Sequence, residues 1–262
     1  MNQILLNKKA IVCGATQGIG KATALLLAEM GASVTLVARD EKKLNAVKKE
    51  LNKAHGQKHY TISADFSIPA TLKMEVESFV EKKGPFHILV NNTGGPPAGP
   101  ILNAKTLEFT QAFSSHLICN HIMVQAVAEG MKSAGYGRII NIISTSVKQP
   151  IPGLGVSNTI RAAVANWAKT LSLELAAFGV TVNNVLPGAT ATQRITALLD
   201  AKSKKTGKSV EDLKTEMINE IPMKRFAEAR EIAEAIAFLA SPNAGYITGI
   251  NLPVDGGRTA CL

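Results

Sequence analysis

Short apolar runs alternate with longer amphipathic segments along the whole chain. The short runs are rich in Val and Ile, which favour buried strands, and the amphipathic segments of about ten residues or more favour helices. The expected strands are 9–13, 33–38, 60–64, 88–90, 138–143, 181–186 and 250–254. The expected helices are 21–30, 41–54, 72–83, 157–177 and 230–240, together with a long amphipathic segment over 107–133.

This alternation predicts an α/β fold, a doubly wound parallel sheet with helices on both faces. The length of 262 residues suits one domain, so residues 1–262 are expected to form a single domain. Hydrophobic residues make up 46% and charged residues 19%, a composition that excludes wholesale disorder. In folds of this class, ligands bind at the carboxyl ends of the strands, near the point where the strand order reverses.

Several classes of protein are excluded by what the chain lacks. No run approaches the ~20 apolar residues that span a bilayer, and residues 7–9 interrupt any signal-peptide apolar stretch at the start. The three cysteines, Cys13, Cys119 and Cys261, are odd in number and far apart, which argues against disulfides and a zinc site. We therefore expect a cytoplasmic protein with no metal and no membrane partner.

The formal net charge of +9 attracts anions in general without selecting one of them. Nucleic-acid binding by base stacking is not expected, because the few aromatic residues do not interleave with the basic stretches. Phosphorylated cofactors and acidic carrier proteins are the other anions that this charge would favour.

A glycine-rich turn carries the first chemical signal. Gly14, Gly18 and Gly20 follow the first expected strand and open the first expected helix. Glycines at these places allow a tight turn and let backbone N–H groups approach a pyrophosphate, which the helix dipole also attracts. Taken alone, the same spacing also fits an ordinary tight turn between a strand and a helix.

Further landmarks follow in order along the chain. Asp65 comes after the third expected strand and Asn91-Asn-Thr-Gly94 after the fourth. The later landmarks are Asn141-Ile-Ile-Ser144, Asn183-Asn-Val-Leu-Pro-Gly188, Thr192, Tyr246-Ile-Thr-Gly249 and Val254-Asp-Gly-Gly257. Together these motifs resemble the short-chain dehydrogenase/reductase family over essentially the whole length. Two positions depart from the family pattern: Cys13 stands where Thr is usual, and Thr93 where Ala is usual.

The resemblance implies a seven-stranded Rossmann-like sheet and a bound nicotinamide cofactor. It assigns the pyrophosphate and its ribose to Gly14, Thr16, Gln17, Gly18, Ile19 and Gly20. It places Asp65 and Phe66 at the adenine, and Asn92, Thr93 and Gly94 at the adenine ribose side. It assigns the nicotinamide carboxamide to Pro187, Gly188, Thr190 and Thr192.

Arg39 favours NADP(H) over NAD(H). It ends the second expected strand, where an acidic side chain would bind a ribose 2′-hydroxyl and an Arg can bind a 2′-phosphate. Two neighbours weaken this prediction, because Gln17 supplies no second basic contact and Asp40 follows directly.

The catalytic positions depart most from the family. Family members use a Tyr as general acid and a Lys four residues later, with a Ser thirteen residues before the Tyr and an Asn on the preceding helix. The alignment places Ser144 at the Ser, but Ser157 at the Tyr, Arg161 at the Lys and His116 at the Asn. The chain therefore resembles a divergent branch, with Ser-x-x-x-Arg in place of Tyr-x-x-x-Lys, that is similar to 3-oxoacyl-carrier-protein reductases.

The consequence for proton transfer is large. An aliphatic hydroxyl is far less acidic than a phenol, so Ser157 alone is a poor proton donor, and Arg161 keeps its charge and cannot relay protons. His116 is the one candidate replacement acid, since imidazole titrates near ~6.5, although a His packed at a helix interface and hydrogen-bonded to a neighbour is the more ordinary role.

Two further expectations concern the substrate side and assembly. The Lys-rich segment of about 189–222 lies where the family has a mobile lid, and could dock an acidic carrier protein or a coenzyme A phosphate. Its acidic residues offset part of that charge, so a solvated pair of helices explains it equally well. The helix 157–177 has a broad apolar face. The resemblance implies that this face forms a homodimer, commonly within a homotetramer.

Two hypotheses of different classes follow. The first is an NADP(H)-dependent oxidoreductase that transfers a hydride between nicotinamide and a carbonyl or alcohol substrate, a 3-oxoacyl thioester being one candidate. The second is a catalytically weak or inactive NADP(H)-binding sensor or interaction protein, which the missing Tyr and Lys motivate.

Overall fold

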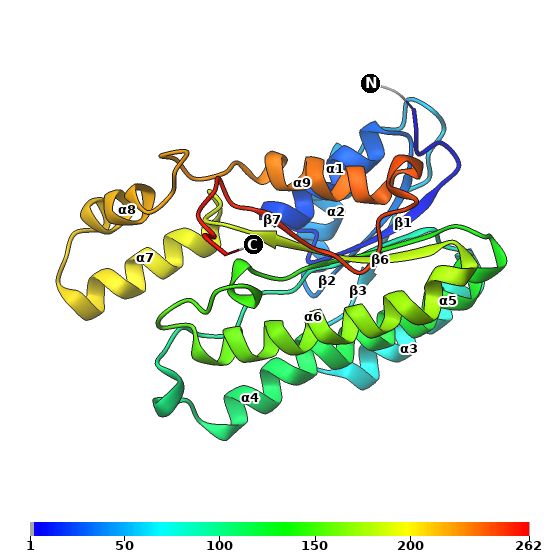
Figure 1. Cartoon of the computed structure of the whole chain (residues 1–262). Coiled ribbons are helices and arrows are strands. Elements are labelled where there is room, and N and C mark those ends of the chain that lie inside the picture. The colour runs from blue at the N-terminus through cyan, green and yellow to red at the C-terminus, as the bar shows by residue number, and fades with distance from the viewer. Residues whose placement is uncertain (1–2, 262) are drawn as a thin grey trace.

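The computed structural model describes residues 3–261 and contains one seven-stranded parallel sheet (Figure 1). Its strand order is β3-β2-β1-β4-β5-β6-β7. The strands are β1 (Lys9–Cys13), β2 (Ser33–Ala38), β3 (Tyr60–Ser63), β4 (Ile88–Asn91), β5 (Gly137–Ile142), β6 (Val180–Pro187) and β7 (Asn251–Val254). The order reverses between β1 and β4, so the carboxyl ends of these two strands flank the expected ligand crevice.

Helices cover both faces of the sheet, which confirms the predicted doubly wound α/β fold. The helices α1 (Gly18–Glu29), α2 (Glu41–Glu50) and α9 (Ala229–Ala240) pack on one face, and α3 (Pro69–Lys83), α5 (Cys119–Ser133) and α6 (Gly155–Leu175) on the other (Figure 1). The shorter α4 (Thr106–Phe113) lies beside α6. The pair α7 (Gln193–Thr206) and α8 (Val210–Asn219) extends away from the sheet (Figure 1).

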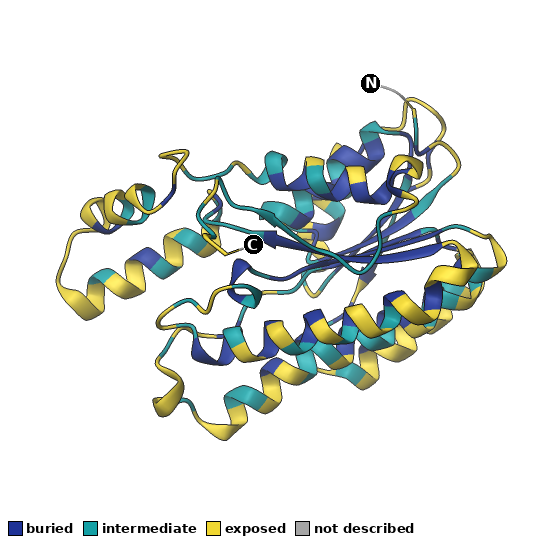
Figure 2. Ribbon diagram, viewed as in Figure 1, coloured by how far each residue is buried: buried dark blue, intermediate teal, exposed yellow. Residues whose placement is uncertain are grey.

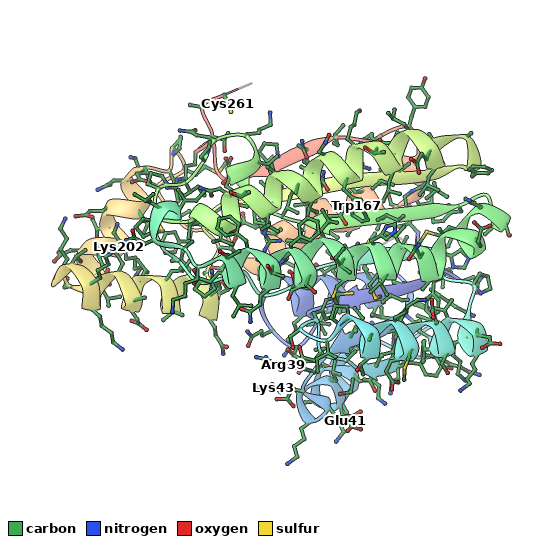
Figure 3. All side chains as sticks on the ribbon, turned by 90° about the horizontal axis from the view of Figure 1, so that it is seen from below. Arg39, Glu41, Lys43, Trp167, Lys202 and Cys261 are labelled. Atoms are coloured by element: carbon green, nitrogen blue, oxygen red, sulfur yellow. The ribbon has the colours of Figure 1, made fainter. Side chains whose placement is uncertain are left out.

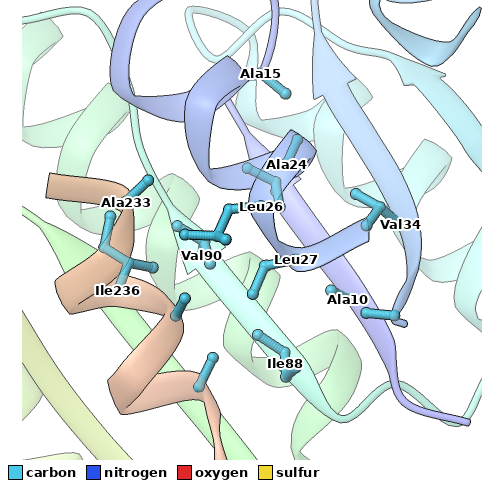
Figure 4. Packing of buried hydrophobic residues seen from close by; sticks show 14 of the residues in the cluster. Ala10, Ala15, Ala24, Leu26, Leu27, Val34, Ile88, Val90, Ala233 and Ile236 are labelled. Atoms are coloured by element: carbon cyan, nitrogen blue, oxygen red, sulfur yellow. The ribbon is translucent and has the colours of Figure 1, made fainter. Parts of the chain in front are cut away.

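Each face of the sheet packs against helices through a hydrophobic core, which explains why the strands are continuous apolar runs in the sequence. On the α1 and α9 face, Leu26 and Leu27 pack with Ile236 against Ile88 and Val90 of β4 (Figure 4). These side chains are at most 1% exposed, and the central strands are buried along their length (Figure 2). Because parallel strands have both faces covered, alternation of polar and apolar residues is not expected in them.

A row of hydrogen-bonded asparagines crosses the sheet from β4 to β7. Asn91 on β4 donates through Nδ2 to Oδ1 of Asn141 on β5 at 2.9 Å, and Asn141 donates in the same way to Asn184 on β6 at 2.9 Å. Asn184 continues the row to Asn251 on β7 at 2.8 Å. The register pairs each asparagine with the next, so the bonds form a ladder of buried amides. The ladder fixes the four strands β4, β5, β6 and β7 relative to one another.

Two regions agree with the sequence prediction and add detail to it. The amphipathic segment 107–133 is helical, and a π-helical turn over Ser114–Ile118 joins α4 to α5. Amphipathic periodicity does not reveal such a turn, because the turn takes in one extra residue and leaves the apolar stripe in place. The Lys-rich segment of about 189–222 contains a pair of helices, α7 and α8, in which Leu199 and Leu213 are buried.

Within residues 3–261, no helix is both long enough and apolar enough to cross a membrane. The same part of the chain holds no group of three or more His, Cys, Asp or Glu side chains arranged to bind a metal ion. Its cysteines are free, with Cys13 and Cys119 buried and Cys261 exposed.

Candidate functional site

The glycine turn between β1 and α1 depends on the absence of side chains. Gly14 has a φ of +57° and Gly18 a φ of +53°, a region that residues with a β-carbon rarely adopt. A β-carbon at Gly20 would collide with the carbonyl oxygen of Gly14. The turn therefore closes tightly against the start of α1, as the spacing predicts.

Two segments from elsewhere in the chain hold this turn. Asn92, just after β4, donates through Nδ2 to the carbonyl oxygens of Cys13 and Gly14, each at 3.3 Å. Thr192 lies against the other side, because its Cγ2 would be 3.3 Å from a β-carbon at Gly18. The ends of β1 and β4 and the segment before α7 thus meet at the glycine turn.

The geometry of the turn fits a diphosphate. The helix α1 starts at Gly18, and the side chain of Gln17 makes no capping hydrogen bond to its first N–H groups. Uncapped N–H groups at a helix start attract anions. An open hollow of about 530 Å³ adjoins the turn, and its lining includes Thr16, Gln17, Lys21 and Thr192. Ile19 contributes differently, since it packs against the core.

The end of β2 presents a cation. Arg39, labelled in Figure 3, is exposed directly after β2. Asp40 is occupied elsewhere, because its Oδ1 accepts a hydrogen bond from the Lys43 N–H at 3.0 Å and caps α2. This bond lowers the pKa of Asp40, and the ammonium group of Lys43, at 3.6 Å, contributes to the same shift. The carboxylate of Asp40 therefore caps α2 and forms no ion pair with Arg39, which is the cation at the end of β2.

The predicted adenine residues lie on the next strand end. Asp65 accepts a hydrogen bond from the Ser67 N–H at 2.8 Å, and the bonds to Ser67 lower the pKa of Asp65, with the Arg39 charge adding to the effect. Phe66 packs against the core of the α3 and α5 face, and its carbonyl accepts from Sγ of Cys119 at 3.2 Å. Arg39 and Asp65 therefore lie near each other at the carboxyl ends of β2 and β3.

The predicted carboxamide residues form a compact turn after β6. Pro187 ends the strand, and a β-carbon at Gly188 would lie 2.7 Å from the Cα of Asp255. Thr190 donates to the carbonyl of Gly188 at 3.1 Å, and Thr192 to that of Thr190 at 3.3 Å. These bonds direct the chain from the sheet edge back to the glycine turn.

The two serines lie on different elements at the end of β5. Ser144 follows β5, and its Oγ accepts a hydrogen bond from the Ser146 N–H at 3.1 Å. Ser157 is buried in the first turn of α6, one helical turn before Arg161. Arg161 donates through Nη1 to the carbonyl of Ile142, at the end of β5, at 3.0 Å. This bond ties α6 to the strand that leads to Ser144.

His116 and Thr93 are hydrogen-bonded to each other. The π-helical turn carries His116, which is 2% exposed, and its Nδ1 lies 2.5 Å from Oγ1 of Thr93. Both residues differ from those that the family usually has at these positions, and the two unusual side chains are hydrogen-bonded to each other. Burial, followed by the charges of Arg161 and Arg194, lowers the pKa of His116 to about 2. His116 is therefore a neutral imidazole near pH 7, which can take part in hydrogen bonds but carries no excess proton to give.

Sequence reasoning missed Arg194 in the first turn of α7. Its Nη2 donates to the carbonyl of Pro96 at 2.7 Å, and partial removal of its guanidinium from water lowers its pKa. A β-carbon at Gly95 would lie 3.2 Å from Nη2 of Arg194 and 3.8 Å from Nη2 of Arg161. Gly94, the last predicted adenine-ribose residue, directly precedes this position. No local pattern marks Arg194, because only the path of the chain after β6 brings α7 to the loop after β4.

The described tyrosines cannot replace the missing one. Tyr60 begins β3, Tyr136 directly precedes β5, and Tyr246 precedes β7, so all three lie toward the amino ends of strands. Tyr136 donates to the carbonyl of Ala240 at 2.7 Å, and Tyr246 is fully exposed. The chemistry of this chain therefore depends on the side chains gathered at the carboxyl ends of β4 and β5.

Comparison with known proteins identifies the kind of protein that has this arrangement. The family described as enoyl-(acyl carrier protein) reductase matches residues 14–259. A glucose 1-dehydrogenase of Gluconobacter oxydans is 38% identical over 96% of this chain and 92% of its own, and a 3-oxoacyl-[acyl-carrier-protein] reductase of Staphylococcus epidermidis is 35% identical over 96% and 99%. The structure of L-sorbose reductase from Gluconobacter frateurii, complexed with NADPH and L-sorbose, superposes with a TM-score of 0.92 at 28% identity and covers both chains completely.

Proposed function

The chain belongs to the short-chain dehydrogenase/reductase family of oxidoreductases, and on this premise we propose an NADP(H)-dependent enzyme that acts on a carbonyl or alcohol substrate. The observation that carries the proposal is the glycine turn, held by Asn92 and Thr192 at an uncapped helix start. In this proposal, the whole chain acts as one cofactor-binding domain. The predicted residues at the turn hold the diphosphate, and those after β6 hold the carboxamide.

The preference for NADP(H) rests on Arg39. Its guanidinium is exposed at the end of β2, and Asp40, the next residue along the chain, caps α2. Asp65 lies near Arg39 without an ion pair to it, and an exposed guanidinium at this place favours a 2′-phosphate through charge-assisted hydrogen bonds. The structure of L-sorbose reductase complexed with NADPH is consistent with this preference.

The reacting end contains two serine hydroxyls and the neutral imidazole of His116. When bound, the cofactor supplies or accepts a hydride, and the chain's task is to orient the substrate and stabilise its oxygen. We assign hydrogen-bond donation to that oxygen to Ser144 and Ser157, and the orientation of α6 to the bond between Arg161 and Ile142. His116, neutral and bonded to Thr93, acts as a hydrogen-bonding group, so the proton delivered to the product comes from solvent.

The lid and the assembly are further parts of the proposal. Residues of about 189–222, which form α7 and α8, would cover the substrate, and the Arg194 bond to Pro96 supports a closed position. A homodimer or homotetramer would cover the exposed apolar side chains on α4, α6 and the turns that follow them, among them Leu107, Phe113, Leu173 and Phe178.

Two measurements test the proposal. Calorimetric titration with NADPH and NADH tests cofactor binding, and absence of any affinity would refute it. A panel of ketones, sugars and oxoacyl thioesters, followed by NADPH absorbance, tests turnover in the wild type and in Ser144→Ala and His116→Ala. Ser144→Ala should lower kcat about 10²-fold or more, since it removes a donor to the reacting oxygen. Tight NADPH binding without turnover across the panel would instead support the nucleotide-binding sensor.

A further inference from the structure

Two arginines near the carboxyl ends of β4 and β5 have no anionic partner among residues 3–261. Arg161 is 8% exposed, whereas Arg194, in the first turn of α7, is an exposed residue whose guanidinium is partly covered where it bonds to Pro96. None of the ten ion pairs among residues 3–261 includes either of them. Burying a charge without a counter-charge is costly, so the buried charge of Arg161 favours an anion beside it.

The two guanidinium groups converge on one place. Both Nη2 atoms lie on the side of Gly95 where a β-carbon would be, at 3.2 Å and 3.8 Å from it, so they are within about 7 Å of each other. Each group makes one hydrogen bond to a described carbonyl, Arg161 to Ile142 and Arg194 to Pro96. The Nη2 atom of Arg161 has no acceptor among the described residues. Burial, and after it the charges of Arg161 and Arg194, lowers the pKa of His116. Burial, and after it the charge of Arg194, lowers the pKa of Arg161, so the two cations act on their surroundings at short range.

The position of this pair separates it from the glycine turn. Arg161 lies one helical turn after Ser157, and its bond to Ile142 lies two residues before Ser144. Arg194 starts near the glycine turn, but its side chain reaches the loop after β4. The pair therefore borders the two hydroxyls assigned to the reacting oxygen, whereas the diphosphate has its own N–H groups at α1.

We propose that Arg161 and Arg194 bind an anionic group of the substrate, a carboxylate or a phosphate, so that the enzyme acts on charged carbonyl compounds such as oxo acids. This inference rests on the proposed hydride transfer and names the substrate class for it. A guanidinium offers a planar pair of N–H donors that matches a carboxylate, and two such groups hold the anion in one orientation. Neutral sugars and neutral thioesters would leave both charges unpaired.

The test compares substrates that differ only in charge. Pyruvate, acetoacetate and levulinate place the carboxylate at three distances from the carbonyl, and their methyl esters and the N-acetylcysteamine thioester of acetoacetate are neutral counterparts. The wild type should have a kcat/KM for the best acid that exceeds that for its ester by about 10- to 100-fold. In Arg194→Gln, kcat/KM for the acid should fall by about the same factor, and kcat/KM for the ester should fall by no more than about threefold. Arg225→Gln is the matched control, because it makes the same change at an exposed residue paired with Glu231.

A binding measurement without turnover separates this inference from the proposed function. Calorimetry of acetoacetate with the NADP⁺ complex should give a Kd that Arg194→Gln weakens about 10-fold or more and that Arg225→Gln leaves within about twofold. Arg194-dependent binding without any NADPH oxidation would remove the hydride transfer and keep the anion site. Equal reduction of acids and neutral esters by the wild type and Arg194→Gln would keep the hydride transfer and overturn the anion site. Arg194→Gln could also weaken the Kd for NADP⁺ as much as it weakens the Kd for acetoacetate. That result would assign the two arginines to the phosphates of the cofactor and would overturn the substrate anion site.

Discussion

The charge state of His116 gives the sharpest test of the site. The pKa of this group falls to about 2 in the folded protein, because the ring is buried and faces the cations Arg161 and Arg194. In the unfolded chain the same imidazole titrates near ~6.5. As the pH falls through this value, the unfolded state binds a proton that the folded state does not, so stability present above about pH 6.5 is lost as the solution becomes acidic.

The size of the effect follows from the unfolded pKa, provided that the folded pKa lies well below 5. Between pH 7 and pH 5, this one group should lower the free energy of unfolding by about 2 kcal/mol. The substitution His116→Asn removes the titrating ring and introduces the residue that the family usually has at this place. It also removes the bond to Thr93, which changes the stability of the variant by the same amount at both pH values.

The assay is urea unfolding of the wild type and His116→Asn at pH 7 and pH 5, followed by the fluorescence of Trp167. The other groups with lowered pKa values, His59 and His87 among them, are present in both proteins and cancel in the double difference. We expect the wild type to lose about 2 kcal/mol more than the variant. Equal losses would mean that His116 is already protonated at pH 5 in the folded protein, and the ring would then be available as a proton donor.

Three further outcomes are expected. Gly18→Ala should weaken the Kd for NADPH about 10-fold or more by titration, since its β-carbon would lie 3.3 Å from Thr192 and its φ is positive. Gly207→Ala, also at a positive φ but facing open space, should leave that Kd unchanged. Asn141→Ala should lower the free energy of unfolding by about 2–5 kcal/mol in urea, because it leaves buried amide groups unpaired on both sides of the ladder; a loss below about 1 kcal/mol would count against the ladder. Arg39→Ala should weaken NADPH about 10- to 100-fold and leave NADH within about twofold, and an equal loss for both cofactors would refute the assigned preference.

The sequence determined the framework because the signals for it are local. Apolar runs between amphipathic segments predicted all seven strands, and the first two, Lys9–Cys13 and Ser33–Ala38, have the predicted ends. Glycine is the residue that tolerates the φ values at Gly14 and Gly18, so the positions of the glycines also predicted the turn between β1 and α1. The family resemblance was equally accessible, since its motifs are short and each follows a strand.

The tertiary structure decided which side chains meet. Arg194 and Gly95 are 99 positions apart in the sequence, and the bond between Arg194 and Pro96 exists only because α7 returns to the loop after β4. The partnership of His116 with Thr93 depends on the π-helical turn, which leaves the apolar periodicity unchanged. Charge and burial act through space, so the neutral state of His116 and the unpaired guanidinium groups could not be predicted from residue order. The sequence thus determined where the cofactor turn lies, and folding decided what chemistry surrounds the reacting end.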